Sequence, residues 1–397
     1  MSDDERDPEE EEEEEEEDQD LTNSDVVTKY KAAADITNKC LVTLLPKLVP
    51  GAKLIDLCKT VDDMMNAELA AIFKGKKLEK GIAFPCCLSL NNVVGHYCPA
   101  DDDTVTLKAG DVAKVDFGCH IDGYIATQAH THVVSDSAAD GATPVPPVTG
   151  RVADAVACAQ TCFDAAVRLI RPGKKTDEVD KVLAKIAEVY GCQIVEGVMT
   201  HQMKRFVIDG NKVIPNKPAT DQRVDSQEIE AGEVYAVDIV VSTGEGHSRM
   251  IDERQTTVYK RALDMEYKLK MKAARAVFSD INKRFPALPF TTRYLEPPEG
   301  KASLIKLGMK ELLDHELLYA YPVLYDKAEK HGECHVVQVK GTILLMPSGW
   351  SDRVTKVPPE MVAEAKSDKK VEDQEILDIL ATSIDNPKKK KDKKKKK

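Results

Sequence analysis

Two stretches of the chain nearly repeat each other. Residues 109–117 read AGDVAKVDF and residues 231–239 read AGEVYAVDI, so Asp116 and Asp238 occupy the same place in two matching units. Each unit opens on a glycine turn and an acidic residue and continues with the alternating apolar residues of a β-strand. Such a repeat predicts two related halves that meet across a pseudo-twofold axis. Two carboxylates near the centre of a domain need partners there.

Helices and strands alternate along the rest of the chain. Apolar residues at helical spacing predict helices from residue 24 to Pro50, over 61–73, from about residue 151 to Pro172, and from Thr176, a candidate N-cap, to Gly191. Alternating residues predict strands over 93–98, 112–117 and 124–134. Helix pairs combined with antiparallel-looking strands indicate an α+β fold.

The net charge of −12 averages three unlike regions. Residues 1–20 hold fifteen acidic residues and one Arg, for a net charge of −14. Residues 388–397 hold nine Lys and one Asp, for a net charge of +8, which leaves −6 for the residues between. Blocks of like charge repel themselves and bury little surface, so both tails are expected to be disordered.

Cysteine usage and hydropathy predict a location inside the cell and away from membranes. The ten cysteines lack the spacing of a disulfide framework, and no apolar run reaches the roughly 20 residues of a membrane span. An acidic N-terminus is unlike a signal peptide. Reduced thiols are therefore expected, in the cytosol or the nucleus. Cys158 and Cys162, four residues apart on a predicted helix, suit a buried face better than a metal half-site.

Several polar groups can converge on the two repeated aspartates. They are His120, Thr127, His130, His132, His201 and Lys340. Carboxylates with an imidazole suit a dinuclear hydrolytic metal site. His130 and His132 share one face of a predicted strand, where packing is favoured over ligation.

Four segments together resemble a known family. GIAFPCCLSLNNVVGHYCP, DVAKVDFGCHIDGYIATQAHT, GEVYAVDIVVSTGEG and VKGTILLMP occur in the order found in type 2 methionine aminopeptidases. The resemblance covers about residues 24–350 and implies a pita-bread fold with pseudo-twofold halves. His96 in GHYCP corresponds to a substrate-contacting His of that family, although Cys98 stands where Thr is usual.

The five metal ligands of active members are Asp, Asp, His, Glu and Glu. Carried over by position, the first Asp is kept as Asp116 and the His as His201. The position of the second Asp is occupied by Thr127. The first Glu is shortened to Asp238 and the last is replaced by Lys340.

Charge decides what these replacements mean. Two carboxylates and one ammonium leave a net charge of −1 to hold two divalent cations. Each unit charge repelled at ~4 Å costs about 4 kcal/mol at an effective dielectric of about 20. We therefore expect no metal, no cofactor and no catalytic residue. Instead, Lys340 is expected to pair with Asp116 and Asp238 and to hydrogen-bond Thr127.

A degenerate site and a lysine-rich end resemble the proliferation-associated, or ErbB-receptor-binding, proteins, which lack peptidase activity. That resemblance implies binding to ribosomes or structured RNA and to protein partners, passage through cytoplasm, nucleus and nucleolus, and a role in growth and translation control. We expect a monomer with a pita-bread domain over 21–360, a helical insert over about 256–325 and a C-terminal helical segment over 361–387. The poly-Glu N-terminus departs from the family. The alternative is a residual aminopeptidase that holds one metal at Asp116, His201 and Asp238.

Basic residues of the insert and the tail are the candidates for RNA contact. They are Lys260, Arg261, Lys268, Lys270, Lys272, Arg275, Lys283 and Arg284 in the insert, and Lys388, Lys389, Lys390, Lys391, Lys393 and Lys394 in the tail. A solvated helix face explains the insert residues equally well, but a lysine tail gains affinity for phosphates through counterion release. Aromatic residues make up 5% of the chain, so base stacking is not indicated.

The two charged tails predict opposite effects on RNA binding. The acidic block can occupy the lysines as an internal polyanion, so deleting residues 1–20 should tighten RNA binding, most strongly at low salt. Deleting residues 388–397 should weaken binding and flatten the slope of log affinity against log salt, which is about −3.5 for about five phosphates of a single strand. A salt series on both truncations measures this. Equal low-salt affinities of the full chain and the N-terminal truncation would reduce the acidic block to a solubilising extension.

Overall fold

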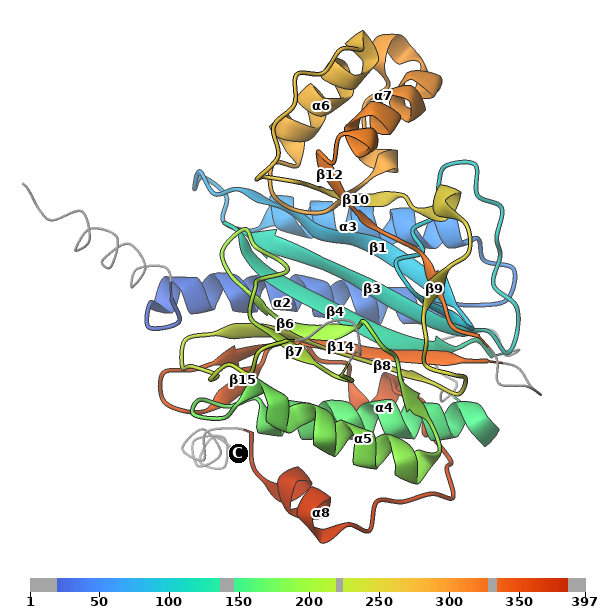
Figure 1. Ribbon diagram of the computed structural model, residues 1–397, viewed down its shortest axis with the longest axis vertical. Coiled ribbons are helices and arrows are strands. Elements are labelled where there is room, and N and C mark those ends of the chain that lie inside the picture. Colours follow the sequence, from blue (N-terminus) through green and yellow to red (C-terminus); the bar gives the residue numbers. More distant parts are fainter. Residues whose placement is uncertain (1–19, 136–145, 219–223, 328–333, 385–397) are drawn as a thin grey trace, which may run out of the picture.

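The computed structural model describes residues 20–135, 146–218, 224–327 and 334–384 (Figure 1). The lysine tail and all but the last residue of the acidic block lie outside these ranges. The disorder expected for them therefore stays a prediction.

One nine-stranded sheet forms the centre of the molecule, and its strand pairs are antiparallel. Its order is β1 (Lys80–Leu90), β3 (Val112–Ile121), β4 (Tyr124–Val133), β14 (Val336–Leu345), β8 (Val234–Ser242), β6 (Met199–Met203) and β7 (Val213–Pro215). Two short strands pair beside this path, β15 (Ser351–Arg353) with β14 and β5 (Gln193–Ile194) with β8. The repeated units lie on β3 and β8, which flank the central pair β4 and β14. This arrangement matches the pseudo-twofold relation expected from the sequence.

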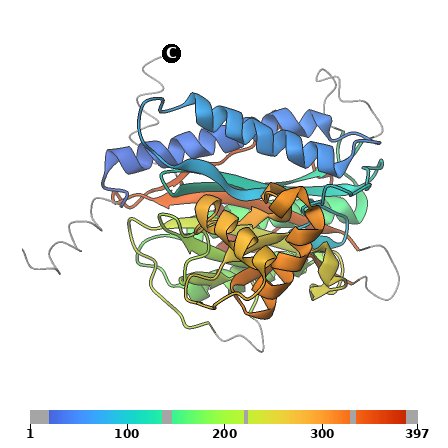
Figure 2. The ribbon, with the colours of Figure 1, turned by 90° about the horizontal axis from the view of Figure 1, so that it is seen from above.

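Two helix pairs cover the sheet, one for each half. Helices α2 (Ser24–Leu44) and α3 (Leu54–Ala71) pack on the half that contains β3, and α4 (Gly150–Leu169) and α5 (Val179–Tyr190) pack on the half that contains β8 (Figures 1 and 2). Val115 and Phe117 join the core under the first pair, and Val237 and Ile239 join the core under the second. Because side chains alternate along a strand, Asp116 and Asp238 point away from both helix pairs.

Element boundaries show where sequence patterns mislead. The second helix begins at Leu54 rather than at residue 61. Thr176 does not cap α5: it begins a 3-10 turn over Thr176–Glu178, and the helix starts at Val179. Gly191 ends α5 as expected, in the left-handed conformation at φ 61° that glycine adopts without strain.

The long strand β1 was not predicted, because seven consecutive residues of it are buried and no alternation marks it. Of the strand expected over 93–98, only β2 (Val93–Gly95) forms. It joins β13 (Leu324–Tyr325) and β9 (Arg249–Met250) in a small sheet of the order β2–β13–β9.

The segment 256–325 stands out from the sheet (Figure 1). It contains α6 (Lys272–Arg284) and α7 (Ala302–Asp314), and also a second small sheet of β11 (Phe290–Thr291), β10 (Val258–Arg261) and β12 (Leu318–Tyr321). The insert therefore combines two helices with a small antiparallel sheet and is not helical alone. It has a core of its own that includes Val277, Phe290 and Leu312. Arg293 fixes it to the body: its guanidinium lies 3.1 Å from Asp62 of α3, and both side chains are buried.

The C-terminal segment returns to the body below the second helix pair. Helix α8 (Gln374–Ala381) buries Ile376 in the core shared with α4 and α5. Short 3-10 turns complete the chain at Leu45–Lys47, Glu253–Gln255, Thr292–Tyr294, Pro298–Gly300 and Pro359–Met361. Among the described residues, no helix combines the length and the hydropathy that a membrane crossing requires.

Candidate functional site

Strand register brings the site residues into one row. Asp116 of β3 pairs with Ala129 of β4, Ala129 pairs with Lys340 of β14, and Lys340 pairs with Asp238 of β8. Residues directly opposite in an antiparallel pair share a face, so these side chains all point away from the helices. The small side chain of Ala129 lets Lys340 reach across β4 to Asp116.

The Lys340 ammonium lies between the two repeated carboxylates. Its Nζ is 2.7 Å from Asp116 Oδ2 and 2.9 Å from Asp238 Oδ2, and none of the three side chains is more than 10% exposed. Burial by itself lowers the pKa of Lys340, but the two aspartates outweigh it and raise that pKa above its usual value. Lys340 is therefore a permanent cation, and the ion pair expected from the sequence is present.

The expected hydrogen bond between Lys340 and Thr127 is absent. Thr127 Oγ1 is buried and makes no hydrogen bond among the described residues. Gln338 contacts the carboxylates instead: its Nε2 donates to Asp238 Oδ1 at 2.9 Å and to Asp116 Oδ2 at 3.4 Å. Gln338 was missed in the sequence, although it lies two residues before Lys340 and so on the same strand face.

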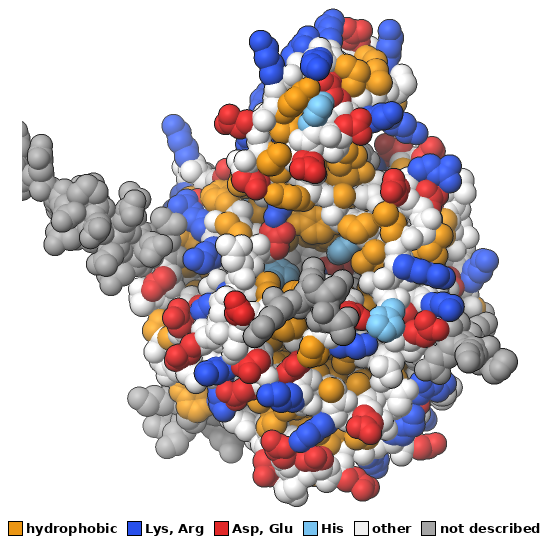
Figure 3. Space-filling view, in the orientation of Figure 1, with side chains coloured by type: hydrophobic (Ala, Val, Ile, Leu, Met, Phe, Trp, Pro, Cys, Tyr) orange, Lys and Arg blue, Asp and Glu red, His pale blue; other side chains and the backbone are white. Residues whose placement is uncertain are grey.

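A pocket of about 520 Å³ opens in front of this ion network. It is lined by Lys340, Gln338, Thr127 and His201, and on the opposite side by Phe84, His96 and Tyr321. The His96 ring lies edge-on to Tyr321, with centroids 5.5 Å apart. Figure 3 shows the hollow beneath the insert, with histidine side chains inside it.

Both pocket histidines are neutral at pH 7. Burial and the Lys340 ammonium lower the pKa of His201, and they lower that of His96 to about 4. His96 also has φ 65°, a left-handed conformation that is uncommon outside glycine and that functional sites often contain. His130 is paired with Val115 on the helix-facing side of β4, so it and His132 point away from Asp116.

These residues do not fit a divalent metal ion. The position between Asp116 and Asp238, which a cation would share, is held by the Lys340 ammonium at hydrogen-bonding distance from both. The positions of Thr127 and Lys340 offer no carboxylate. In the part of the chain that the structure describes, no group of three or more His, Cys, Asp or Glu side chains is arranged to hold a metal.

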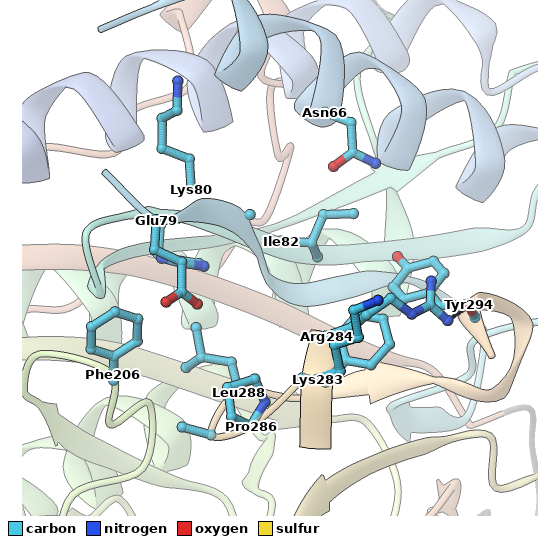
Figure 4. A pocket seen from close by; sticks show the side chains of 14 residues that line it. Asn66, Glu79, Lys80, Ile82, Phe206, Lys283, Arg284, Pro286, Leu288 and Tyr294 are labelled. Atoms are coloured by element: carbon cyan, nitrogen blue, oxygen red, sulfur yellow. Dashed lines mark hydrogen bonds between the residues drawn. The ribbon is translucent and has the colours of Figure 1, made fainter. Parts of the chain in front are cut away.

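A second pocket, of about 500 Å³, separates the insert from the edge of β1 (Figure 4). The Glu79 carboxylate points into it between Phe206 and Leu288, whereas Lys80 points away and donates to Ile72 O at 2.7 Å. Arg284 lines this pocket, but its guanidinium is held by Asp280 and by the Tyr294 carbonyl. Arg284 is thus a structural residue of the insert.

The other basic residues of the insert fall into two groups. Lys260 pairs with Asp209, Lys272 pairs with Glu299 at 2.7 Å, and Arg261 lies over the Phe278 ring. Within the described ranges, no ion pair is recorded for Lys268, Lys270, Arg275 or Lys283. Arg275 instead donates to the carbonyls of Leu269 and Lys270.

A shallow groove of about 600 Å³ runs over the insert between Lys268, Arg275, Tyr267 and Phe278. The Tyr267 ring is itself stacked on His315, with centroids 3.6 Å apart. The low aromatic content of the whole chain concealed this local cluster. The groove residues come from one segment of the insert, and tertiary structure adds His315 from a distant position.

Lys114 is a matched comparison for Lys340. It is also fully buried, on β3 two residues before Asp116 and on the same face. Its Nζ donates to the carbonyl oxygens of Asn91 at 3.0 Å and Val112 at 3.3 Å. No carboxylate among the described residues pairs with it, and burial lowers its pKa to about 7.

Replacing each lysine by methionine should change stability in opposite directions. Lys340→Met leaves the buried carboxylates of Asp116 and Asp238 without a cation and should lower the free energy of unfolding by about 3 to 5 kcal/mol. Lys114→Met removes an uncompensated charge and should raise it by about 1 to 4 kcal/mol at pH 7. Both carbonyls keep a hydrogen-bond donor in Lys114→Met. Asn91 O also accepts from Val336 N, and Val112 O also accepts from Asn91 N.

The pH dependence separates the two lysines further. The pKa of Lys114 is lower in the folded protein than its unfolded value of about 10.4. Between about pH 7 and that value, the unfolded chain binds more protons, so the native protein gains stability as pH rises. In Lys114→Met, the free energy of unfolding should not show this rise between about pH 7 and the unfolded pKa of lysine. Urea unfolding across this pH range measures both effects, and a Lys340→Met midpoint equal to that of the parent would contradict the ion pair.

Comparisons with known proteins place the chain in a family. Residues 28–265 match the model of metallopeptidase family M24. A Solanum tuberosum protein named ERBB-3 binding protein 1 is 48% identical over 357 residues, which are 89% of this chain and 85% of that one. A Schizosaccharomyces pombe protein named curved DNA-binding protein is 37% identical over 385 residues, 94% of each chain.

The solved structure of a thermophilic Arx1 superposes with a TM-score of 0.82 at 27% identity, over 92% of this chain and 100% of that one. The resemblance inferred from the four sequence segments is thereby confirmed. The chain belongs to metallopeptidase family M24, has its pita-bread fold, and groups within it with the ErbB-3 binding proteins.

Proposed function

We propose that this protein is a non-catalytic M24 member that binds RNA, including ribosomal RNA, together with protein partners. It acts as a monomer in the cytoplasm, nucleus and nucleolus, in growth, ribosome biogenesis or translation control. The observation that carries the non-catalytic part is the Lys340 ammonium between Asp116 and Asp238.

Peptide hydrolysis in this family type depends on metal-activated water. Lys340 stays protonated and cannot accept a proton from water, and the neutral imidazole of His201 faces the same cation. The alternative of a residual aminopeptidase requires one metal at Asp116, His201 and Asp238. An ion there would lie against an ammonium that already contacts both carboxylates.

Metal content and peptidase activity distinguish the two functions. The purified protein should hold no stoichiometric divalent ion and should release no Met from Met-initiated peptides. Thr127→Asp with Lys340→Glu restores two carboxylates and should make the melting temperature rise on addition of Mn²⁺ or Co²⁺. Thr127→Asp alone, with Lys340 retained, is the control and should not respond. Tight metal binding with turnover in the unmodified protein would establish the peptidase.

RNA binding is supported by the insert and by one relative. Lys268, Lys270 and Lys283 are exposed, and Lys268 lines the groove of Tyr267 and Phe278. Cations beside partly exposed rings suit phosphates and unstacked bases. The Schizosaccharomyces pombe relative is named as a curved DNA-binding protein. Lys260, Arg261, Lys272 and Arg275 also belong to the insert, but their contacts within the protein reduce what they offer an RNA.

Neutralising the exposed lysines should weaken RNA binding without harming the fold. The slope of log affinity for single-stranded RNA against log salt is negative. Lys268→Gln, Lys270→Gln and Lys283→Gln together should reduce its magnitude by about 2, at about 0.7 per lost phosphate contact. The matched control is Lys59→Gln with Lys108→Gln and Lys181→Gln, which removes the same charge from exposed sites on the body. Equal slopes for the two triple variants would exclude the insert as an RNA contact.

A further inference from the structure

The strand β1 has an open edge where it begins. It is the last strand in the order of the nine-stranded sheet, so one side of its backbone faces away from β3. Asp122 N donates to Glu79 O across the β1–β3 pair. Because backbone groups alternate sides along a strand, the N–H and C=O groups of Lys80 and Ile82 point away from β3. Among the described residues, no hydrogen bond to these outward groups is recorded.

Farther along β1, the same edge is closed by the rest of the protein. Cys86 N donates to Asp62 Oδ1 of α3 at 3.1 Å, and Leu88 N donates to Tyr97 O at 2.8 Å. The open part lies at the start of the strand, beside the pocket of about 500 Å³ that separates β1 from the insert. We call this space the strand-edge pocket.

Two polar groups that line the strand-edge pocket have no recorded partner within the described ranges. One is the Glu79 carboxylate, which points into the pocket between Phe206 and Leu288 (Figure 4). The other is Nε2 of His120, a side chain that is only 3% exposed. His120 Nδ1 accepts from Gly123 N at 3.1 Å, and burial lowers the pKa of His120 to about 4. The ring is therefore neutral, with its proton on Nε2 as a hydrogen-bond donor.

The residues around these two groups leave room for a further side chain. A Cβ atom at Gly81 would lie 3.1 Å from His120 Nε2, so a larger residue there would cover the ring. Phe206 lies edge-on to His120, with ring centroids 5.7 Å apart. Its φ of 58° is a left-handed conformation that is rare for a bulky residue and that clusters at functional sites.

The charges around the strand-edge pocket favour a cation as its occupant. The two arginines near Glu79 are held by other carboxylates: Arg205 pairs with Asp122 at 2.8 Å, and Arg284 pairs with Asp280 at 2.7 Å. Helix α6 also ends at this pocket, and the C-terminal end of a helix carries a partial negative charge. A lysine or arginine side chain brought by a partner is therefore complementary to the Glu79 carboxylate.

We propose that the open edge of β1 binds an extended segment of a partner protein, which adds a strand to the sheet and places a lysine or arginine beside Glu79. The inference rests on the proposed binding of protein partners and names the surface and the residue type that they use. The backbone of the segment pairs with the outward groups of Lys80 and Ile82. A segment residue opposite Gly81 projects to the same face as Glu79, so its side chain can cross the glycine to the carboxylate. Lys283 is exposed on the insert side of the pocket, where its ammonium can extend into solvent.

The test uses synthetic strands and the full-length protein. The first probe is a short capped peptide of alternating threonine and valine with one arginine at its centre, and the second has glutamate in that place. A third probe is the arginine peptide with N-methyl groups along one edge, which removes backbone donors without changing the charge. Fluorescence anisotropy measures affinity, and hydrogen exchange of the Lys80 and Ile82 amides measures strand addition. The protein should bind the arginine probe with slowed exchange at both amides, and N-methylation should abolish both effects.

Two variants separate the ion pair from the backbone contact. Glu79→Lys should weaken the arginine probe about tenfold and strengthen the glutamate probe, because the charge preference is reversed. Glu188→Lys makes the same charge change at an exposed site on α5, in the other half of the molecule, and should leave both affinities unchanged. Ile82→Pro removes an outward donor but no bond to β3, so it should weaken the arginine probe as N-methylation does.

Equal affinity for the arginine probe and its N-methylated form overturns the inference, because ion pairing alone would then explain the binding. Equal affinity of the parent and Glu79→Lys for the arginine probe also overturns it. If single-stranded RNA rather than peptide protects the Lys80 and Ile82 amides, the pocket belongs to the RNA surface and strand addition is refuted. If the arginine probe does not bind while RNA still binds the insert, this inference alone fails. If neither binds, the proposed function fails as well.

Discussion

The ammonium group of Lys340 sets the charge balance at the centre of this protein. Lys340 lies on the strand next to Asp238 and reaches over Ala129 to Asp116, so a single cation neutralises carboxylates from both halves of the fold. A buried carboxylate without a partner is costly, and two of them at one pseudo-twofold axis repel each other. The ion pair therefore joins the two halves at the place where metal ions would hold them in an active M24 enzyme.

The cavity in front of the ion pair is lined by rings as well as by the ion network. His96, Tyr321 and Phe84 line about 520 Å³ of space, and His96 has a left-handed backbone. Burial, together with the Lys340 ammonium, lowers the pKa of His96 and of His201 and keeps both neutral. The pocket thus presents neutral rings beside a fixed cation that contacts both repeated carboxylates.

The proposed nucleic-acid binding depends on where positive charge is left without a counter-ion. In the insert, the Arg284 guanidinium is paired with Asp280, whereas the exposed Lys268 and Lys283 remain available to a phosphate. Near the end of α8, Arg168 and Arg353 line one hollow, and the Arg168 charge helps to lower the pKa of Arg353. Ion pairs inside the protein, rather than the number of lysines, decide which surfaces can gain affinity by counterion release.

The sequence by itself determined the α+β class, the two repeated halves and the replacement of the metal ligands. It could do so because Asp116 and Asp238 lie in matching segments and because Lys340 lies in the last of the four ordered segments that resemble the family. Tertiary structure alone decided the rest. Gln338 rather than Thr127 completes the ion network, since strand register and side-chain length select the partner. The strand β1 gave no periodic signal because it is buried on both faces. Arg293 of the insert meets Asp62 of α3 across 231 residues of sequence, and no local pattern records which distant charges will meet when the chain folds.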